Sequence, residues 1–259
     1  MKNHNGNLIF DRQPQIVSYA SVVGKKEEEG PLREYFDRVI RDSYAGKDTF
    51  EQAESELLNN AVSIALNKAG ITPDDVDIAC CGDLLNQCVA SSFAMRPFGI
   101  PYAGVYGACS TMALGMILAA ITLESGAARR AVCAASSHYC TAERQYRFPL
   151  EYGSQRPPTS QWTVTGAGAC VLEIPQQSSN SPQQSAVSQQ LTTPQPPITF
   201  QQTATSQQSE SVSHPVTTQQ PITSQQTPYL YAARIGKILD YNVTDQNNMG
   251  AAMAPANVK

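Results

Sequence analysis

Apolar side chains recur every three or four positions between residues 50 and 69, the spacing that lines one face of an α-helix. Gly70 follows directly, where helices commonly end on glycine, and Pro73 stands three residues further on. The pattern therefore predicts an amphipathic helix over residues 50–69, with one face packed against a core.

Short apolar runs bounded by glycine, proline or charged residues predict β-strands. Six segments have this character: Gln15–Val23, Val76–Cys81, Pro101–Tyr106, Arg130–Ser136, Trp162–Ile174 and Tyr229–Tyr241. Residues 25–30, which follow the first of them, are predicted to form a loop. Because predicted strands alternate with predicted helices, the sequence favours an α/β fold with a largely parallel sheet.

A second predicted helix has no polar face. The small residues Gly107–Ser110 form a turn, the helix then runs to about Ser125, and Gly126 closes it. No charged residue occurs in this helix before Glu124. A helix that is apolar all round must be covered on every side, so we expect residues 111–125 to lie in the middle of a domain.

Composition divides the chain into three parts. Between residues 176 and 228, glutamine, serine, threonine and proline supply 41 of 53 residues, and Glu210 is the one formally charged side chain. A segment with so few large apolar groups cannot offset the entropy lost when its backbone is ordered. We predict a folded part over 1–175, a disordered insertion over 176–228 in the loop of a hairpin, and a final strand within 229–259.

Charge and cysteine usage exclude several classes of protein. The chain has 18 basic and 22 acidic side chains, a net charge of -4, which argues against nucleic-acid binding through general positive charge. Seven cysteines are spread through apolar runs without a disulfide framework: Cys80, Cys81, Cys88, Cys109, Cys133, Cys140 and Cys170. The histidines lie far apart and no Cys-x-x-Cys pair occurs, so we expect no structural zinc site.

The sequence carries no signal for secretion, membrane insertion or a nucleotide cofactor. Residues 1–10 lack the apolar core of a signal peptide, and the apolar run 112–123 is shorter than the roughly 20 residues that span a bilayer. The glycines of Gly166–Gly168 lack the third glycine of a dinucleotide-binding motif. We therefore expect a cytosolic protein without a cofactor, which meets a membrane only as a peripheral partner.

Cys109 is the first candidate for chemistry. It lies in Gly-Ala-Cys-Ser-Thr, after a predicted strand and at the start of the apolar helix. Free amide groups and the positive end of the helix dipole favour a thiolate or a bound anion at such a place. The residue is then a nucleophile, part of an anion-binding site, or a small packing residue. A nucleophile needs a base, and His138, at a strand end, is the one histidine in the predicted core.

Other candidate side chains follow the strands. Asp83 and Asn86 come just after a predicted strand, at the edge where open α/β sheets bind ligands. Arg144 and Arg147 lie in a cluster of charged and aromatic residues over 141–162. Arginines form forked contacts with carboxylates, so these two either bind an acidic ligand or pair internally with nearby glutamates.

Several longer motifs carry a resemblance to a known family. They are Gly-Asp-Leu-Leu-Asn-Gln (82–87), Tyr-Gly-Ala-Cys-Ser-Thr (106–111), Ala-Ser-Ser-His (135–138), Thr-Ala-Glu-Arg-Gln-Tyr-Arg-Phe-Pro (141–149), Glu-Tyr-Gly-Ser-Gln-Arg-Pro (151–157), Thr-Val-Thr-Gly-Ala-Gly-Ala (163–169) and Asn-Met-Gly-Ala-Ala-Met-Ala-Pro-Ala (248–256). Together they closely resemble the stage V sporulation protein AD family. The resemblance implies that 1–175 is the N-terminal half of a thiolase-like fold: a mixed, mostly parallel five-stranded sheet, helices on both faces and a buried central helix. It implies that 229–259 contains the final strand of this half and the start of a truncated second half.

The resemblance also implies a function. The family belongs to the machinery that moves dipicolinic acid into the developing spore, and its members bind this ligand without being regarded as catalysts. For this chain it implies a dipicolinate site, with or without calcium, peripheral to the spore inner membrane beside the channel components. The ligand-binding candidates are then Cys109, Ser110, Thr111, Asp83, Asn86, His138, Arg144 and Arg147.

Two departures from the family pattern leave alternatives open. The family lacks the glutamine-rich tract, and the second half of a thiolase-like fold is largely missing here. The chain is then a fragment, a non-functional truncated copy, or a protein that hides its apolar helix in an oligomer such as a homodimer. A condensing enzyme that transfers acyl groups through Cys109 is the catalytic alternative, although such an enzyme needs oriented donors for its oxyanion.

Overall fold

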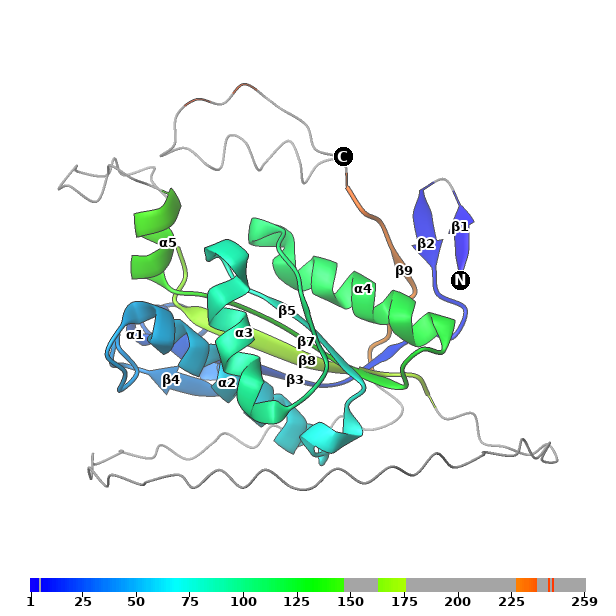
Figure 1. Ribbon diagram of the computed structural model, residues 1–259, viewed down its shortest axis with the longest axis horizontal. Helices are drawn as coiled ribbons and strands as arrows, with labels where there is room; N and C mark the ends of the chain where they lie inside the picture. The colour runs from blue at the N-terminus through cyan, green and yellow to red at the C-terminus, as the bar shows by residue number, and fades with distance from the viewer. Residues whose placement is uncertain (5, 147–162, 176–226, 237–241, 243, 245–259) are drawn as a thin grey trace, which may run out of the picture. The chain divides into compact units, whose positions relative to one another are not determined.

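A mixed six-stranded sheet forms the centre of the fold (Figure 1). The computed structural model describes residues 1–4, 6–146, 163–175, 227–236, 242 and 244. The strands, in spatial order, are β4 Arg38–Ile40, β3 Gln15–Gly24, β8 Gly166–Glu173, β7 Arg130–Ser137, β5 Ile78–Gly82 and β6 Tyr102–Gly104. β8 is antiparallel to both of its neighbours, and the other three pairings are parallel. The predicted α/β fold with a mostly parallel mixed sheet is confirmed, with a sixth, three-residue strand, β4, beyond the five expected.

Successive side chains of a strand point to opposite faces of the sheet, and each face packs against different helices. On β7, Val132 and Ala134 point into a cluster with α2 (Phe50–Ala69) and α3 (Val89–Met95). Ala131 and Cys133 of the same strand point into a second cluster with α4 (Thr111–Ser125). Successive residues of a strand face opposite sides, so a run that is apolar throughout, as in β7, must be covered twice. Helices therefore cover both faces, as predicted.

Helix α2 begins and ends as its sequence predicts. The Thr49 side chain accepts a hydrogen bond from the Gln52 N–H at 3.3 Å, which caps the first turn. Gly70 ends the helix with φ 67°, a left-handed conformation that glycine adopts without strain. The predicted bounds of 50 and 69 are confirmed.

Helix α4 lies along β5 and β7 and is covered on one side (Figure 1). A Cβ on Gly115 would lie 2.7 Å from the Cys80 carbonyl oxygen, so glycine is what allows this close approach to β5. Ala119 and Leu123 are fully buried on the same side. On the other side Ile117 is only half-buried and Ala113 is exposed. The expectation that every side is covered therefore does not hold among the described residues.

By length and composition, Ala108–Ser125 is the one stretch of the described chain that could also cross a membrane, although only 33% of it is buried. Core helices of soluble proteins have the same composition. The helix ends at Gly126, with φ 81°, as predicted.

The first predicted strand continues into a short helix, α1 Lys25–Glu28, where a loop was expected. The other short elements are α5 Tyr139–Tyr146 and five 3₁₀ turns, η1 Arg33–Tyr35, η2 Pro73–Asp75, η3 Asn86–Cys88, η4 Arg96–Phe98 and η5 Ala108–Ser110. Neither α3 nor α5 was predicted, because each is only seven or eight residues long and too short to show a clear period.

The chain after the low-complexity tract does not form the predicted hairpin. β8 pairs with β3 and β7, whereas β9, only Ala232–Ala233, pairs with β2 in a separate antiparallel sheet of order β1-β2-β9. The other two strands of that sheet are β1 Lys2–His4 and β2 Asn7–Ile9. The predicted strand 229–241 is thus mostly absent over 229–236, and residues 237–241, like the insertion over 176–226, lie outside the described part.

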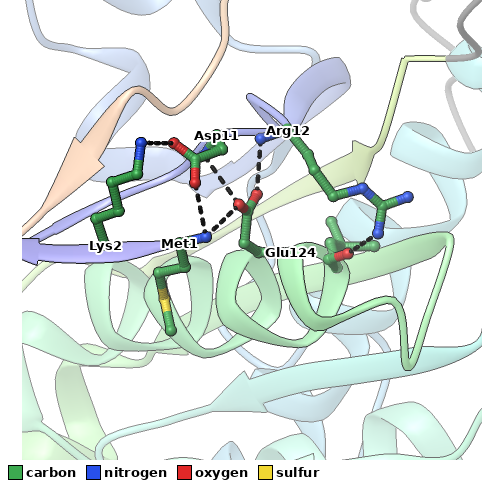
Figure 2. Close-up of polar contacts among 6 residues, drawn as sticks. Met1, Lys2, Asp11, Arg12 and Glu124 are labelled. Atoms are coloured by element: carbon green, nitrogen blue, oxygen red, sulfur yellow. Dashed lines mark hydrogen bonds and ion pairs between the residues drawn. The ribbon is translucent and has the colours of Figure 1, made fainter.

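The carboxyl end of α4 is fixed by Glu124, whose side chain is only 3% exposed. Figure 2 shows its polar contacts. Its carboxylate accepts hydrogen bonds from the backbone N–H groups of Asp11 and Arg12, both at 2.9 Å. It also forms an ion pair with the amino group of Met1 at 2.8 Å. The Arg12 guanidinium donates to the Leu123 carbonyl at 2.8 Å. The segment that leads into β3 is thereby held against the end of α4.

Candidate functional site

The parallel strands β5, β6 and β7 are neighbours, so the segments that leave their carboxyl ends meet at one edge of the sheet. These segments contain residues 83–88, 105–111 and 138–146. Hydrogen bonds join them: the Cys88 thiol donates to the Val105 carbonyl at 3.6 Å, and Asn86 pairs with Gln145 of α5. The edge that the sequence favoured for a ligand is therefore the edge where most of the candidate residues are found.

The start of α4 divides its three candidates into two exposed residues and one buried residue. Thr111 is buried, and its hydroxyl donates to the Ala108 carbonyl at 2.8 Å while it accepts from the Gly107 N–H at 3.1 Å. Cys109 and Ser110 are exposed. The Ser110 hydroxyl donates to the Gly107 carbonyl at 2.7 Å and keeps its lone pairs as acceptors. Thr111 thus closes the turn, and the other two stand at the positive end of a 15-residue helix.

Close packing beneath this turn depends on Gly82, the last residue of β5. A Cβ at that position would lie 1.9 Å from the Val105 carbonyl oxygen and 2.6 Å from Cγ2 of Thr111. Any larger residue would therefore push the β6–α4 connection away from β5. Gly82 fixes the position of the helix start relative to the sheet.

Asp83 is buried and bound to its own loop. One carboxylate oxygen accepts from the Leu85 N–H at 2.8 Å and the other from the Ser91 N–H at 2.6 Å. It therefore orders the loop after β5 and the first turn of α3. Asn86, in contrast, is exposed; its side-chain oxygen accepts from Gln145 Nε2 at 3.0 Å, and its N–H donates to Gln145 Oε1 at 3.3 Å. Asn86 thus holds α5 to this loop.

His138 is buried and uses both ring nitrogens. Nδ1 accepts a hydrogen bond from the Cys140 N–H at 3.2 Å, so the ring proton is on Nε2, which donates to the Ser43 carbonyl at 2.8 Å. The ring also stacks on Phe50, with centroids 5.1 Å apart. Burial lowers the pKa of His138, which favours the neutral ring. The histidine holds residues 43–50 against the start of α5, and neither nitrogen is available as a base.

Arg144 is exposed and forms an ion pair with Glu51 of α2. Of the two interpretations that the sequence left open, internal pairing is present here, although with a glutamate from another helix. Arg147 lies outside the described residues. Among the described residues, no group of three or more histidine, cysteine, aspartate or glutamate side chains could hold a metal ion.

Sequence reasoning missed Glu54, a fully buried carboxyl on α2. Ser136 Oγ donates to Glu54 Oε1 at 3.1 Å, and Thr141 Oγ lies 2.9 Å from Glu54 Oε2. Burial raises the pKa of Glu54 to about 7, with the charge of Asp83 adding to the effect and the two hydroxyls opposing it. A signal was available, because Glu54 precedes Leu57 and Leu58 at the spacing that defines the apolar face of α2.

Two thiols beneath the site are buried. Cys133 and Cys170 lie directly opposite each other on β7 and β8. Their mutual hydrogen bond, followed by burial, holds the pKa of Cys133 well above its usual value. All seven cysteines are free thiols, and Cys109 alone among them is exposed.

Comparison with known proteins finds matches in sequence and in structure. The family model for stage V sporulation protein AD (SpoVAD) matches residues 4–192 and 178–259. Stage V sporulation protein AD of Bacillus subtilis (strain 168) is 34% identical over 248 residues, which cover 96% of this chain. The chain spans 59% of the length of that relative.

Solved structures with a similar arrangement include condensing enzymes. Synthase III for 3-oxoacyl-[acyl-carrier-protein] from Aquifex aeolicus is 14% identical, with a TM-score of 0.43, over 63% of this chain and 55% of its own. A variant of OleA from Xanthomonas campestris with cerulenin is 18% identical, with a TM-score of 0.45, over 64% of this chain and 59% of its own. The relationship that decides the family is the sequence match, which extends over nearly the whole chain: it belongs to the stage V sporulation protein AD family.

Proposed function

We propose that this chain is a non-catalytic component of the sporulation machinery that takes up dipicolinic acid, and that it binds this ligand at the carboxyl edge of β5, β6 and β7. Family membership supports a role in sporulation. Dipicolinate is a flat aromatic ring with two carboxylates. A site for such an anion needs amide or hydroxyl donors, a cation and room for the ring.

The observation that carries the proposal is the exposed start of α4. Cys109 and Ser110 stand at the positive end of this helix, and Arg144 on α5 is exposed near the same edge. Helix dipoles and arginines both favour a carboxylate. Arg144 forms an ion pair with Glu51, and a ligand carboxylate that binds Arg144 must displace Glu51.

The environment of His138 supports binding without catalysis. A condensing reaction through Cys109 needs a base for the thiol and donors for the oxyanion. His138 is buried, and both ring nitrogens are held by the backbone, at Ser43 and Cys140. Among the described residues it is the one histidine near this edge of the sheet.

Two substitutions of opposite effect test the binding site by calorimetry with calcium dipicolinate and with the calcium-free ligand. Arg144→Gln removes the cation and should weaken binding roughly three- to tenfold, the range for a partly solvated charge-assisted contact. Glu51→Gln removes the competing carboxylate and should strengthen binding about twofold to fivefold. Arg33→Gln, at an exposed arginine outside the proposed site, is the matched control. Unchanged affinity in both site variants would remove Arg144 from the site.

One observation favours the catalytic alternative, a condensing enzyme: the Cys109 thiol is exposed at a helix start. The chain is incubated with a radiolabelled acyl thioester, beside Cys109→Ser and, as a control for general thiol reactivity, Cys140→Ser. Stable label that disappears only in Cys109→Ser would support an acyl-enzyme and replace the binding proposal. Label at background level would favour binding.

The partners and location that we propose follow from the family. The chain acts on the cytoplasmic side of the spore inner membrane, attached through components of the dipicolinate channel. It should therefore sediment with spore membranes that contain those components and stay in the supernatant with protein-free vesicles. Equal binding to both would indicate direct insertion, for which Ala108–Ser125 would be the segment.

A further inference from the structure

Glu54 joins three elements of the fold below the candidate site. It lies on α2, its Oε1 accepts from Ser136 at the end of β7, and its Oε2 faces Thr141 in the first turn of α5. The side chains of all three residues are buried. Water is therefore not at hand to satisfy a charge on this carboxyl, and each hydrogen in the cluster must have one definite place.

Counting hydrogens shows where the proton of Glu54 belongs. The Thr141 hydroxyl oxygen lies 2.9 Å from Glu54 Oε2 and also 2.9 Å from the carbonyl oxygen of His138. A hydroxyl has a single hydrogen, and both neighbours are acceptors if Glu54 is ionised. Only a protonated Glu54 satisfies both contacts: its O–H donates to Thr141, and the Thr141 O–H donates to the His138 carbonyl.

We propose that Glu54 is a neutral carboxylic acid that locks α5 to α2 by this chain of hydrogen bonds, and that its loss of a proton as the pH rises releases the lock. When Glu54 ionises, the Thr141 hydrogen turns to the carboxylate, and the His138 carbonyl keeps only its bond from the Ala142 N–H, at 3.0 Å. The first turn of α5, the helix whose last turn carries Arg144, then loses its side-chain support.

The surrounding charges favour the neutral acid. Asp83, in the loop after β5, and Glu51, on α2 itself, both oppose a negative charge at Glu54. On the α5 side, Glu143 is acidic, His138 is neutral and Arg144 is paired with Glu51. In the described residues no lysine or arginine forms an ion pair with Glu54. The folded chain thus holds the proton over a range in which an unfolded glutamate has already released it.

The direction of the pH effect follows from this difference. The pKa of Glu54 is raised from 4.5 to about 7, so between these values the folded chain binds more protons than the unfolded chain. Stability from Glu54 is then full below pH 4.5 and falls as the pH rises to about 7. The folding equilibrium constant should fall by as much as tenfold for each pH unit in this window.

Glu54→Gln tests the lock in the full chain, because a glutamine amide reproduces the neutral acid: its N–H₂ donates to Thr141 and its oxygen accepts from Ser136. Urea unfolding is followed from pH 5 to pH 8. His138, whose pKa is lowered, contributes a change of opposite sign in the same window, so the variants are compared with one another. As the pH rises, the folding constant should fall relative to that of Glu54→Gln in the native sequence and in Glu56→Gln, a half-buried carboxyl of the same helix. The same slope in Glu54→Gln and the native chain would overturn the proposal.

Infrared spectroscopy keeps the test valid if Glu54→Gln does not fold. The native chain at pH 6 should show the carbonyl band of a buried protonated carboxylic acid, and the band should fade by pH 8. Thr141→Val removes the acceptor of the acid proton and should move this band to higher frequency, whereas Thr141→Ser should leave it in place. The proposal would be overturned if the native chain showed no such band, or if Thr141→Val left the frequency of the band unchanged.

Discussion

Two glutamates with buried side chains, on two helices of this fold, have pKa values shifted in opposite directions. Glu54 on α2 is fully buried, and its carboxyl forms hydrogen bonds with two hydroxyl groups. Burial raises its pKa to about 7. Glu124 at the end of α4 has a side chain that is only 3% exposed. Its carboxylate accepts hydrogen bonds from two backbone N–H groups and pairs with an ammonium group. Burial alone would raise the pKa of Glu124, but these donors more than offset it and lower the pKa below its usual value.

The difference shows that burial does not by itself set the charge of a carboxyl. Backbone N–H groups and ammonium groups cannot accept a proton, so every contact that Glu124 makes favours the carboxylate (Figure 2). Hydroxyls can accept as well as donate, so the partners of Glu54 suit the neutral acid equally well. The donors around Glu124 therefore favour its ionised form alone, whereas the hydroxyls around Glu54 can bind either its ionised or its protonated form.

Truncation should separate the two carboxyls most strongly. Glu54→Ala leaves a cavity, removes the carboxyl partner of the buried Ser136 hydroxyl, and leaves Thr141 with its bond to the His138 carbonyl. It should lower the free energy of unfolding by about 3 kcal/mol. Glu124→Ala should lower it by about 1 kcal/mol, because Asp11 and Arg12 are exposed and water can take over their N–H groups. Urea unfolding at pH 6 measures both. Equal losses would mean that the two environments differ less than their contacts indicate.

The fold could be predicted from sequence because its signals are local. The apolar period and Gly70 marked both ends of α2, and the small-residue turn at 107–110 with Gly126 marked α4. Strand pairing was harder: the hairpin was wrong, because the partner of β8 on one side is β3, from the other end of the chain. Periodicity shows that a strand exists but does not show its neighbour.

The position of the candidate site could be predicted from the sequence, but the roles of several of its residues could not. Cys109 and Ser110 follow a strand and begin a helix, which sequence shows. The roles of Asp83 and His138 depend on backbone groups at Ser91 and Ser43, which no motif names. Glu54 was missed because its partners lie 82 and 87 residues away in the sequence. A carboxyl on an apolar helix face is a signal only once the face is known to be buried.

Changing Glu124 to its amide isostere sharpens the comparison through pH. Because the folded pKa of Glu124 is lowered, its stability is present above pH 4.5 and is lost as the pH falls through the folded value. Glu124→Gln should cost about 1 kcal/mol at pH 7, and the difference from the native chain should shrink at pH 4 and below. Urea unfolding at four pH values measures this. A cost that grows in acid would contradict the assignment of Glu124 as a carboxylate.

The smallest expected effect is electrostatic and acts on Glu54 from a distance. Glu51, one turn earlier on α2, carries a charge that opposes ionisation of Glu54. Glu51→Gln should therefore move the midpoint of the Glu54 infrared titration down by a few tenths of a pH unit, the size expected for charges about one helical turn apart in partly aqueous surroundings.

Arg144→Gln should move the same midpoint in the opposite direction, because it removes the cation that is paired with Glu51. The two variants differ from each other only in the sign of the charge that is lost, so they control for the loss of the ion pair itself. If both variants move the midpoint in the same direction, the cause is a change in the packing of α5 on α2. The charge of Glu51 is then not the cause. Opposite movements would show that Glu54 senses the charge of the pair across one turn of α2, while its proton remains held by Thr141.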